Sequence, residues 1–218
     1  MNRISEVSFR AVSLTTASRF AEASALYREV FGYDDPAYGL NPRLLGALAS
    51  NGGSVVGILD ESDQLVAFAY GFCATDRRGF YHYSQSAVVA AGQQGRGLGR
   101  MLKHAQKEVA LSHGMSRMRW TYDPAQIRNA HFNLDVLGAR GRWFAPDMYG
   151  PGTDRVVVEW DLTREHPATP TPVAELAVPT TDLRGSFEAL LGKGLVAVSC
   201  RRRPDGTGVY YFAAADDA

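Results

Sequence analysis

Gln94-Gly95-Arg96-Gly97-Leu98-Gly99 carries more information about this chain than any other stretch of it, because of the segments on either side. An apolar, β-branched segment that ends at residues 88–90 precedes it, which is typical of a buried strand. After it, apolar residues recur at helical spacing from Leu98 to Val109. A strand, a glycine-dense turn and a helix N-terminus together form an anion site, because glycine lets main-chain N–H groups converge and the helix dipole adds positive potential. The sequence therefore predicts that this turn binds a phosphate or pyrophosphate.

The spacing of the glycines distinguishes among the known types of phosphate-binding turn. A P-loop requires Lys and then Ser or Thr after its last glycine, whereas Gly99 is followed by Arg100. A dinucleotide fingerprint requires G-x-G-x-x-G, whereas Leu102 stands where its third glycine belongs. The pattern that remains is Gln-x-x-Gly-x-Gly, carried by Gln94, Gly97 and Gly99. A glycine-rich turn with no ligand is the alternative.

This pattern resembles the acyl-CoA pyrophosphate loop of the GNAT (GCN5-related N-acetyltransferase) superfamily. Other segments resemble a little-characterised bacterial branch of predicted GNAT acetyltransferases, over residues 10–160 with a weaker similarity in the tail. They are Asn51-Gly52-Gly53-Ser54-Val55-Val56-Gly57, Trp120-Thr121-Tyr122-Asp123-Pro124, Asn129-Ala130-His131-Phe132-Asn133-Leu134, Leu137-Gly138-Ala139 and Met148-Tyr149-Gly150. The resemblance implies an α/β (α+β) acyltransferase fold with a mixed, mostly antiparallel sheet flanked by helices. It also implies acetyl-CoA or another acyl-CoA as co-substrate, but it names no acceptor. No metal is expected, because the histidines and cysteines show no metal-ligand spacing.

Hydrophobic periodicity along the chain agrees with the order β-α-α-β-β-β-α-β-α-β-β of that fold. We therefore expect a GNAT domain over 1–163, a proline-rich linker over 164–180, and an appendage of one helix and a hairpin over 181–218. Thr16 and Asp182 are the expected N-caps of two helices. Strands are expected at 7–12, 54–59, 64–73, 80–90, 117–122, 140–149, 155–161, 195–203 and 208–213, and helices at 16–31, 43–49, 94–113, 125–137 and 183–191.

Charge and composition restrict the partners. Lys+Arg and Asp+Glu balance at 23 each, so no overall field attracts nucleic acid or an acidic membrane. The sequence shows neither a secretory leader nor an apolar run of about 20 residues, so we expect a cytoplasmic protein with no membrane partner. Cys73 and Cys200 are expected to be buried, reduced thiols. The run Arg201–Arg203 indicates either an anionic partner or, as is commoner, a solvated strand end. A homodimer is compatible with this fold.

The resemblance implies a role for the main chain around the loop. The N–H groups of the loop would hold the pyrophosphate, and the preceding strand would pair with the pantetheine arm, with the Val89 amide near the thioester carbonyl. Asn129 would bond the pantetheine arm, or it stabilises its own helix. The expected cofactor-binding residues are Val88, Val89, Ala90, Gln94, Gly95, Arg96, Gly97, Leu98, Gly99, Arg100 and Asn129.

The resemblance predicts the catalytic residues less directly than the cofactor-binding residues, because the sequence departs from the family's pattern. Many members carry a tyrosine general acid four residues before the glycine that ends the second cofactor helix, and Leu134 stands there before Gly138. Tyr122, His131 and Tyr149 are the candidates to replace it, and each also has a structural interpretation as a half-buried aromatic or polar cap. His82 is the candidate base on the strand before the loop, since residues 77–107 contain no Asp or Glu.

The sequence as a whole predicts an N-acetyltransferase of the GNAT type that acylates the amine of a small molecule. The alternative is a non-catalytic acyl-CoA-binding or assembly module, which Leu134 and the missing carboxylate favour.

Overall fold

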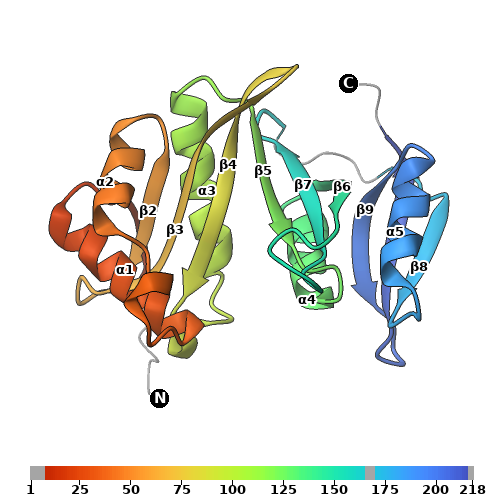
Figure 1. Ribbon diagram of the computed structural model, residues 1–218, viewed down its shortest axis with the longest axis horizontal. Coiled ribbons are helices and arrows are strands. Elements are labelled where there is room, and N and C mark those ends of the chain that lie inside the picture. Colours follow the sequence, from red (N-terminus) through yellow and green to blue (C-terminus); the bar gives the residue numbers. More distant parts are fainter. Residues whose placement is uncertain (1–7, 165–169, 216–218) are drawn as a thin grey trace, which may run out of the picture. The chain divides into compact units, whose positions relative to one another are not determined.

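The computed structural model describes residues 8–164 and 170–215, and the chain falls into two compact units, one that ends at Met118 and one that begins at Arg119. The first unit carries the antiparallel strand order β1-β2-β3-β4 with helices on both faces (Figure 1). Its elements are β1 (Arg10–Ser13), α1 (Ala17–Phe31), η1 (Pro36–Tyr38), α2 (Pro42–Ser50), β2 (Ser54–Leu59), β3 (Leu65–Asp76), β4 (Gly79–Val89), η2 (Ala91–Gln93) and α3 (Leu98–Ser112).

Two apolar layers hold the first unit together, one on each face of its sheet. Because side chains alternate along a strand, Val55 and Phe68 pack with α1 and α2, whereas Val56 and Ala67 pack with α3. Phe68 and Ala67 are both fully buried. The α3 layer fixes the helix whose N-terminus follows the glycine turn, and it thereby fixes that turn against β4.

The second unit carries the strand order β5-β7-β6-β9-β10-β8. Its core is built around Phe187, which is fully buried and packs with Phe144, Tyr210 and Phe212 at ring-centroid distances of 5.7, 4.9 and 5.5 Å. Its elements are β5 (Arg117–Tyr122, which begins at the boundary), α4 (Ile127–His131), η3 (Phe132–Val136), β6 (Arg140–Ala145), β7 (Arg155–Asp161), β8 (Ala174–Val178), α5 (Leu183–Gly192), β9 (Leu195–Arg202) and β10 (Gly208–Ala214).

Local signals in the sequence predict most of these elements correctly. The Thr16 side chain accepts a hydrogen bond from Arg19 N (3.3 Å), and Asp182 accepts one from Gly185 N (2.8 Å), so both expected N-caps are confirmed. Within 8–164 and 170–215, no helix is long and apolar enough to cross a membrane.

Three expectations need correction. The stretch expected to be a linker contains β8, which pairs with β10, because no proline interrupts residues 173–178; residues 165–169 of that stretch lie outside the described residues. The hairpin of the tail extends the strand order of the unit edge to edge through β9, which pairs with β6, and only α5 packs on a face of the sheet, where Phe187 contacts Phe144 of β6. Cys200 is buried and Cys73 is exposed, so the expected burial of both thiols is wrong for Cys73, although both are free.

Candidate functional site

The glycine turn between β4 and α3 has the backbone of an anion cradle. Gly95 and Gly97 adopt φ values of 81° and 80°, a left-handed region that other residues enter only with strain. Gly97 is the N-cap of α3, and its carbonyl accepts from Arg100 N (3.0 Å) and Met101 N (3.1 Å). Among the described residues, the main-chain N–H groups of 96–99 meet no acceptor. The turn therefore presents consecutive unpaired donors at the positive end of a helix of 15 residues.

The surroundings of the turn add positive charge and leave space. Arg96 and Arg100 are exposed, and the first turn of α3 contains no acidic residue. A Cβ atom added at Gly95 or Gly97 would meet nothing within 4 Å. The glycines are therefore required by their backbone angles and not by crowding, and the space beside them can admit a ligand.

A β-bulge on β4 controls which of its side chains face α3. Tyr70 pairs with Ser86 and Gly71 pairs with Ser84, so Gln85 is an extra residue on β4. The alternation changes phase at that point, because an extra residue reverses the side on which the next side chains lie. His82 and Ser84 consequently lie on the α3 face, while Val88 packs in the apolar layer of α1 and α2.

The main chain at the end of β4 is oriented for a ligand. Ala90 N donates to Val66 O at 2.9 Å, on the β3 side. In an antiparallel pair the N–H groups alternate in direction, so the Val89 N–H points away from β3. Val88 is 3 % exposed and anchors this segment in the core.

Beneath β4, a buried hydrogen-bonded chain connects α3, β4 and β2. It runs from Lys103 Nζ to Ser84 Oγ (2.8 Å), from Ser84 Oγ to Gln106 Oε1 (2.8 Å), from Gln106 Nε2 to Ser54 Oγ (3.0 Å), and from Ser54 Oγ to His82 Nε2 (2.9 Å). Gly71 makes room for it, because an added Cβ would lie 2.5 Å from His82 Nε2. Sequence reasoning missed Lys103 and Gln106, although their spacing to Ala110 continues the inward face of the helix.

Burial within this hydrogen-bonded chain disfavours the charged forms of His82 and Lys103. Desolvation, together with the positive charge of Lys103, lowers the pKa of His82 to about 4. Desolvation alone lowers the pKa of Lys103 to about 7. His82 is fully buried, and its Nδ1 has no partner among the described residues. As placed, His82 cannot touch a substrate, so its role as base remains a prediction that its burial disfavours.

Tyr122, in the second unit, is a core residue. Its hydroxyl is buried and has no hydrogen-bond partner among the described residues, and the neighbouring Tyr210 hydroxyl donates to Pro124 O (2.8 Å). Burial raises the pKa of Tyr122 well above its ordinary value, and the interaction with Tyr210 offsets only part of that rise. This environment is poor for an acid that must give up its proton. Leu134 is also core, at 2 % exposed.

The helix over residues 127–136 presents the next two candidates. His131 is half exposed, and its Nδ1 lies 2.9 Å from Cys200 O and 3.2 Å from Asp135 Oδ2. Nδ1 therefore carries the hydrogen that is donated, and Nε2 is left for other contacts. Asn129 is exposed, and its amide makes no hydrogen bond with any described residue.

Tyr149 lies between β6 and β7, and it is the most accessible of the aromatic candidates, with 53 % of its surface exposed. Its hydroxyl is 3.5 Å from Thr121 Oγ1, and the Arg155 guanidinium lies 5.5 Å from its ring centroid. Its main-chain N–H donates to Thr153 Oγ1 (2.8 Å). The residue is thus held by its loop while about half of its surface remains exposed.

Comparison with known proteins places this geometry in a family. The sequence profile of the acetyltransferase (GNAT) family matches residues 20–133, more than half of the chain. A comparison with curated proteins finds no match.

Solved structures share the fold. A protein assigned as an acetyltransferase from Acinetobacter baylyi is 17% identical with a TM-score of 0.59, and the match covers 77% of this chain and 99% of that one. A protein assigned as an acetyltransferase from Salmonella typhimurium, solved with its cofactor acetyl-CoA, is 18% identical with a TM-score of 0.57 over 73% of this chain and 96% of that one. An N-acetyltransferase from Staphylococcus aureus is 17% identical with a TM-score of 0.56 over 72% and 99%. The expected α/β acyltransferase fold is thereby confirmed, and the chain belongs to the GNAT acetyltransferase family.

Proposed function

We propose that this protein is an acyl-CoA-dependent N-acyltransferase that transfers an acetyl group to the amine of a small molecule. The observation that carries the proposal is the turn at Gly95 and Gly97, which offers unpaired N–H groups and the positive end of α3 to a pyrophosphate. Residues 94–100 are the proposed cradle. The chemistry of the donors fits a coenzyme that binds by its pyrophosphate, since main-chain N–H groups and two flanking arginines complement its negative charge.

The reacting carbonyl would be polarised by the end of β4. In the proposed complex, the backbone of residues 88–90 pairs with the pantetheine arm, and the Val89 N–H donates to the thioester oxygen. The amine nitrogen attacks the carbonyl carbon, the negative charge collects on that oxygen, and the C–N bond forms as the C–S bond breaks. The direction of the Val89 N–H, away from β3, supports this role.

Two proton transfers complete the reaction. The amine must lose a proton, and we propose that it binds already neutral or passes the proton to water, because residues 77–107 contain no carboxylate and His82 is buried. The departing thiolate must gain a proton, for which Tyr149 is the proposed donor. The exposure of Tyr149 supports this choice over Tyr122, whose hydroxyl lies in the core.

The test is thiol release from acetyl-CoA with a panel of primary amines, alongside calorimetric titration of acetyl-CoA. Saturable thiol release that depends on one class of amine supports the enzyme. Binding of acetyl-CoA with no turnover for any amine would favour a non-catalytic acyl-CoA-binding module, and absence of binding would refute the assignment of the loop.

The acid is tested by Tyr149→Phe, which removes only the hydroxyl. We expect kcat to fall about 100-fold with the Kd of acetyl-CoA unchanged. Tyr122→Phe is the matched control, and we expect it to keep wild-type kcat. An unchanged kcat for Tyr149→Phe would exclude the tyrosine as acid.

A further inference from the structure

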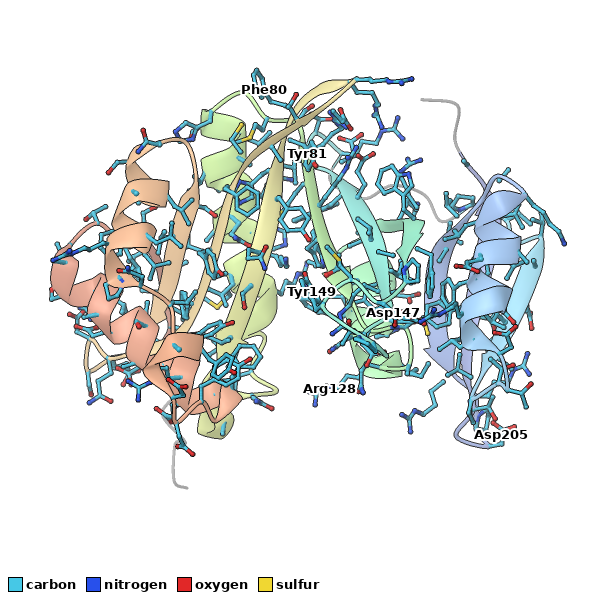
Figure 2. The ribbon with its side chains drawn as sticks, in the orientation of Figure 1. Phe80, Tyr81, Arg128, Asp147, Tyr149 and Asp205 are labelled. Carbon is cyan, nitrogen blue, oxygen red and sulfur yellow. The ribbon has the colours of Figure 1, made fainter. Side chains whose placement is uncertain are left out.

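A cavity of about 500 Å³ in the second unit has a cationic lining that acyl transfer does not explain. Its walls are Ile127, Arg128 and His131 from the helix after β5, and Arg201 and Arg202 from the end of β9. Figure 2 shows Arg128 extending outward from α4. The volume lies in the range of pockets that hold small molecules and is much larger than a single inorganic anion requires.

Asp135 holds two of the lining side chains in place. Its carboxylate accepts from Ser199 Oγ (2.6 Å) and Cys200 N (2.8 Å), which ties the helix to β9. It also lies 3.4 Å from Arg201 Nε and 3.2 Å from His131 Nδ1. Asp135 lies in η3, a π-helical turn of the kind that recurs at functional sites. Its charge is therefore satisfied by Ser199 and the Cys200 main-chain N–H and by two lining side chains, Arg201 and His131.

The other two lining arginines have no such partner. Among the described residues, Arg128 and Arg202 form no ion pair and no side-chain hydrogen bond. Their neighbour Arg203, which does not line the cavity, pairs with Glu175 at 2.7 Å. The cavity thus concentrates guanidinium groups whose donors are uncommitted.

We propose that this cavity binds the phosphate monoester group of a small molecule other than coenzyme A. Guanidinium forks match phosphate oxygens in geometry, and two uncommitted forks with a third arginine suit a dianion better than a single carboxylate. Ile127 supplies an apolar wall for the rest of the ligand. Arg201 and Arg202 lie outside residues 20–133, the part of the chain that the family profile matches, so family-type coenzyme binding does not call for them. The inference does not depend on acyl transfer.

The experiment is calorimetric titration of the full chain with a nucleoside 5′-monophosphate, a hexose 6-phosphate and inorganic phosphate, with the matching nucleoside and hexose as neutral controls. Each titration is repeated with coenzyme A at saturation. If the glycine turn binds coenzyme A, the turn is then occupied during the titration. Arg128→Gln and Arg202→Gln remove the uncommitted forks. Arg43→Gln, an exposed arginine on α2 in the first unit, is the matched control.

We expect at least one monoester to bind when coenzyme A is present, with a Kd that rises at least about tenfold in each cavity variant and not in Arg43→Gln. The affinity should also fall as salt is raised. Equal binding of the neutral counterpart, binding unchanged in both cavity variants, or loss of binding when coenzyme A is added would each overturn the proposal. Absence of any saturable monoester binding would overturn it as well. Because the variants lie in the cavity and not in the glycine turn, these results stand whether or not the protein transfers acyl groups.

Discussion

Replacing Lys103 with methionine should stabilise this protein in a way that depends on pH. Lys103 is buried between α3 and β4, where its ammonium donates to Ser84 Oγ at 2.8 Å. Burial lowers its pKa from 10.5 to about 7. Between these values the unfolded chain binds a proton that the folded chain does not, so stability rises with pH across this window and is lowest at and below its lower end. Methionine has a similar length and no charge to desolvate.

The size of the effect follows from the two pKa values. Each unit of pH inside the window changes the free energy of unfolding by about 1.4 kcal/mol for one proton, so near pH 8 the lysine costs the fold about 3 kcal/mol. Methionine cannot donate to Ser84 Oγ, and the loss of this hydrogen bond lowers the free energy of unfolding by about 1 kcal/mol, which offsets part of the gain. We therefore expect Lys103→Met to gain about 2 kcal/mol near pH 8, and the gain to approach zero near about pH 9.5.

Urea unfolding followed by circular dichroism at several pH values between those limits measures this difference. Lys193→Met is the control, because Lys193 is exposed and its replacement removes the same charge. Subtracting the variant from the wild type cancels other groups that titrate, including Cys200, whose pKa burial raises to about 12. A difference between wild type and Lys103→Met that stays constant with pH would refute the reasoning.

Two further substitutions test the loop and the core. Gly97→Ala forces alanine to a φ of 80° and should cost about 1 kcal/mol of stability and weaken acetyl-CoA binding about tenfold by calorimetry, whereas Gly92→Ala, where φ is not positive and an added Cβ meets nothing, should change neither. Equal effects of the two would contradict the role of the left-handed turn. Phe187→Ala should lower the free energy of unfolding by about 3–5 kcal/mol, measured with urea, because the ring is fully buried. Phe80→Ala, at 67 % exposed, should change it by less than about 0.5 kcal/mol, and a similar loss in both would argue against Phe187 as the centre of the core.

Local signals in the sequence predicted the loop and most of the elements. The glycine spacing predicted a tight turn before a helix, and Gly95 and Gly97 adopt left-handed angles there. The bulge at Gln85 could not be predicted, because strict alternation along β4 gives no sign of an extra residue until the partner strand fixes the register. The buried hydrogen-bonded chain from Lys103 to His82 depends on that register. Because of the bulge, residues 82 and 84 and residues 87 and 89 do not follow one continuous alternation of sides along β4.

The sequence by itself indicated the family and predicted the anion cradle, because both depend on residues close together in the chain. Only the tertiary structure decided which catalytic candidates are accessible, since burial is a property of packing: it placed Tyr122 and His82 in the interior and left Tyr149 exposed. The structure also decided where the arginine run lies, because pairing of β9 within the second unit brings Arg201 and Arg202 to one cavity with Arg128. Such long-range contacts arise from the pairing of distant strands and helices, and no local pattern encodes them.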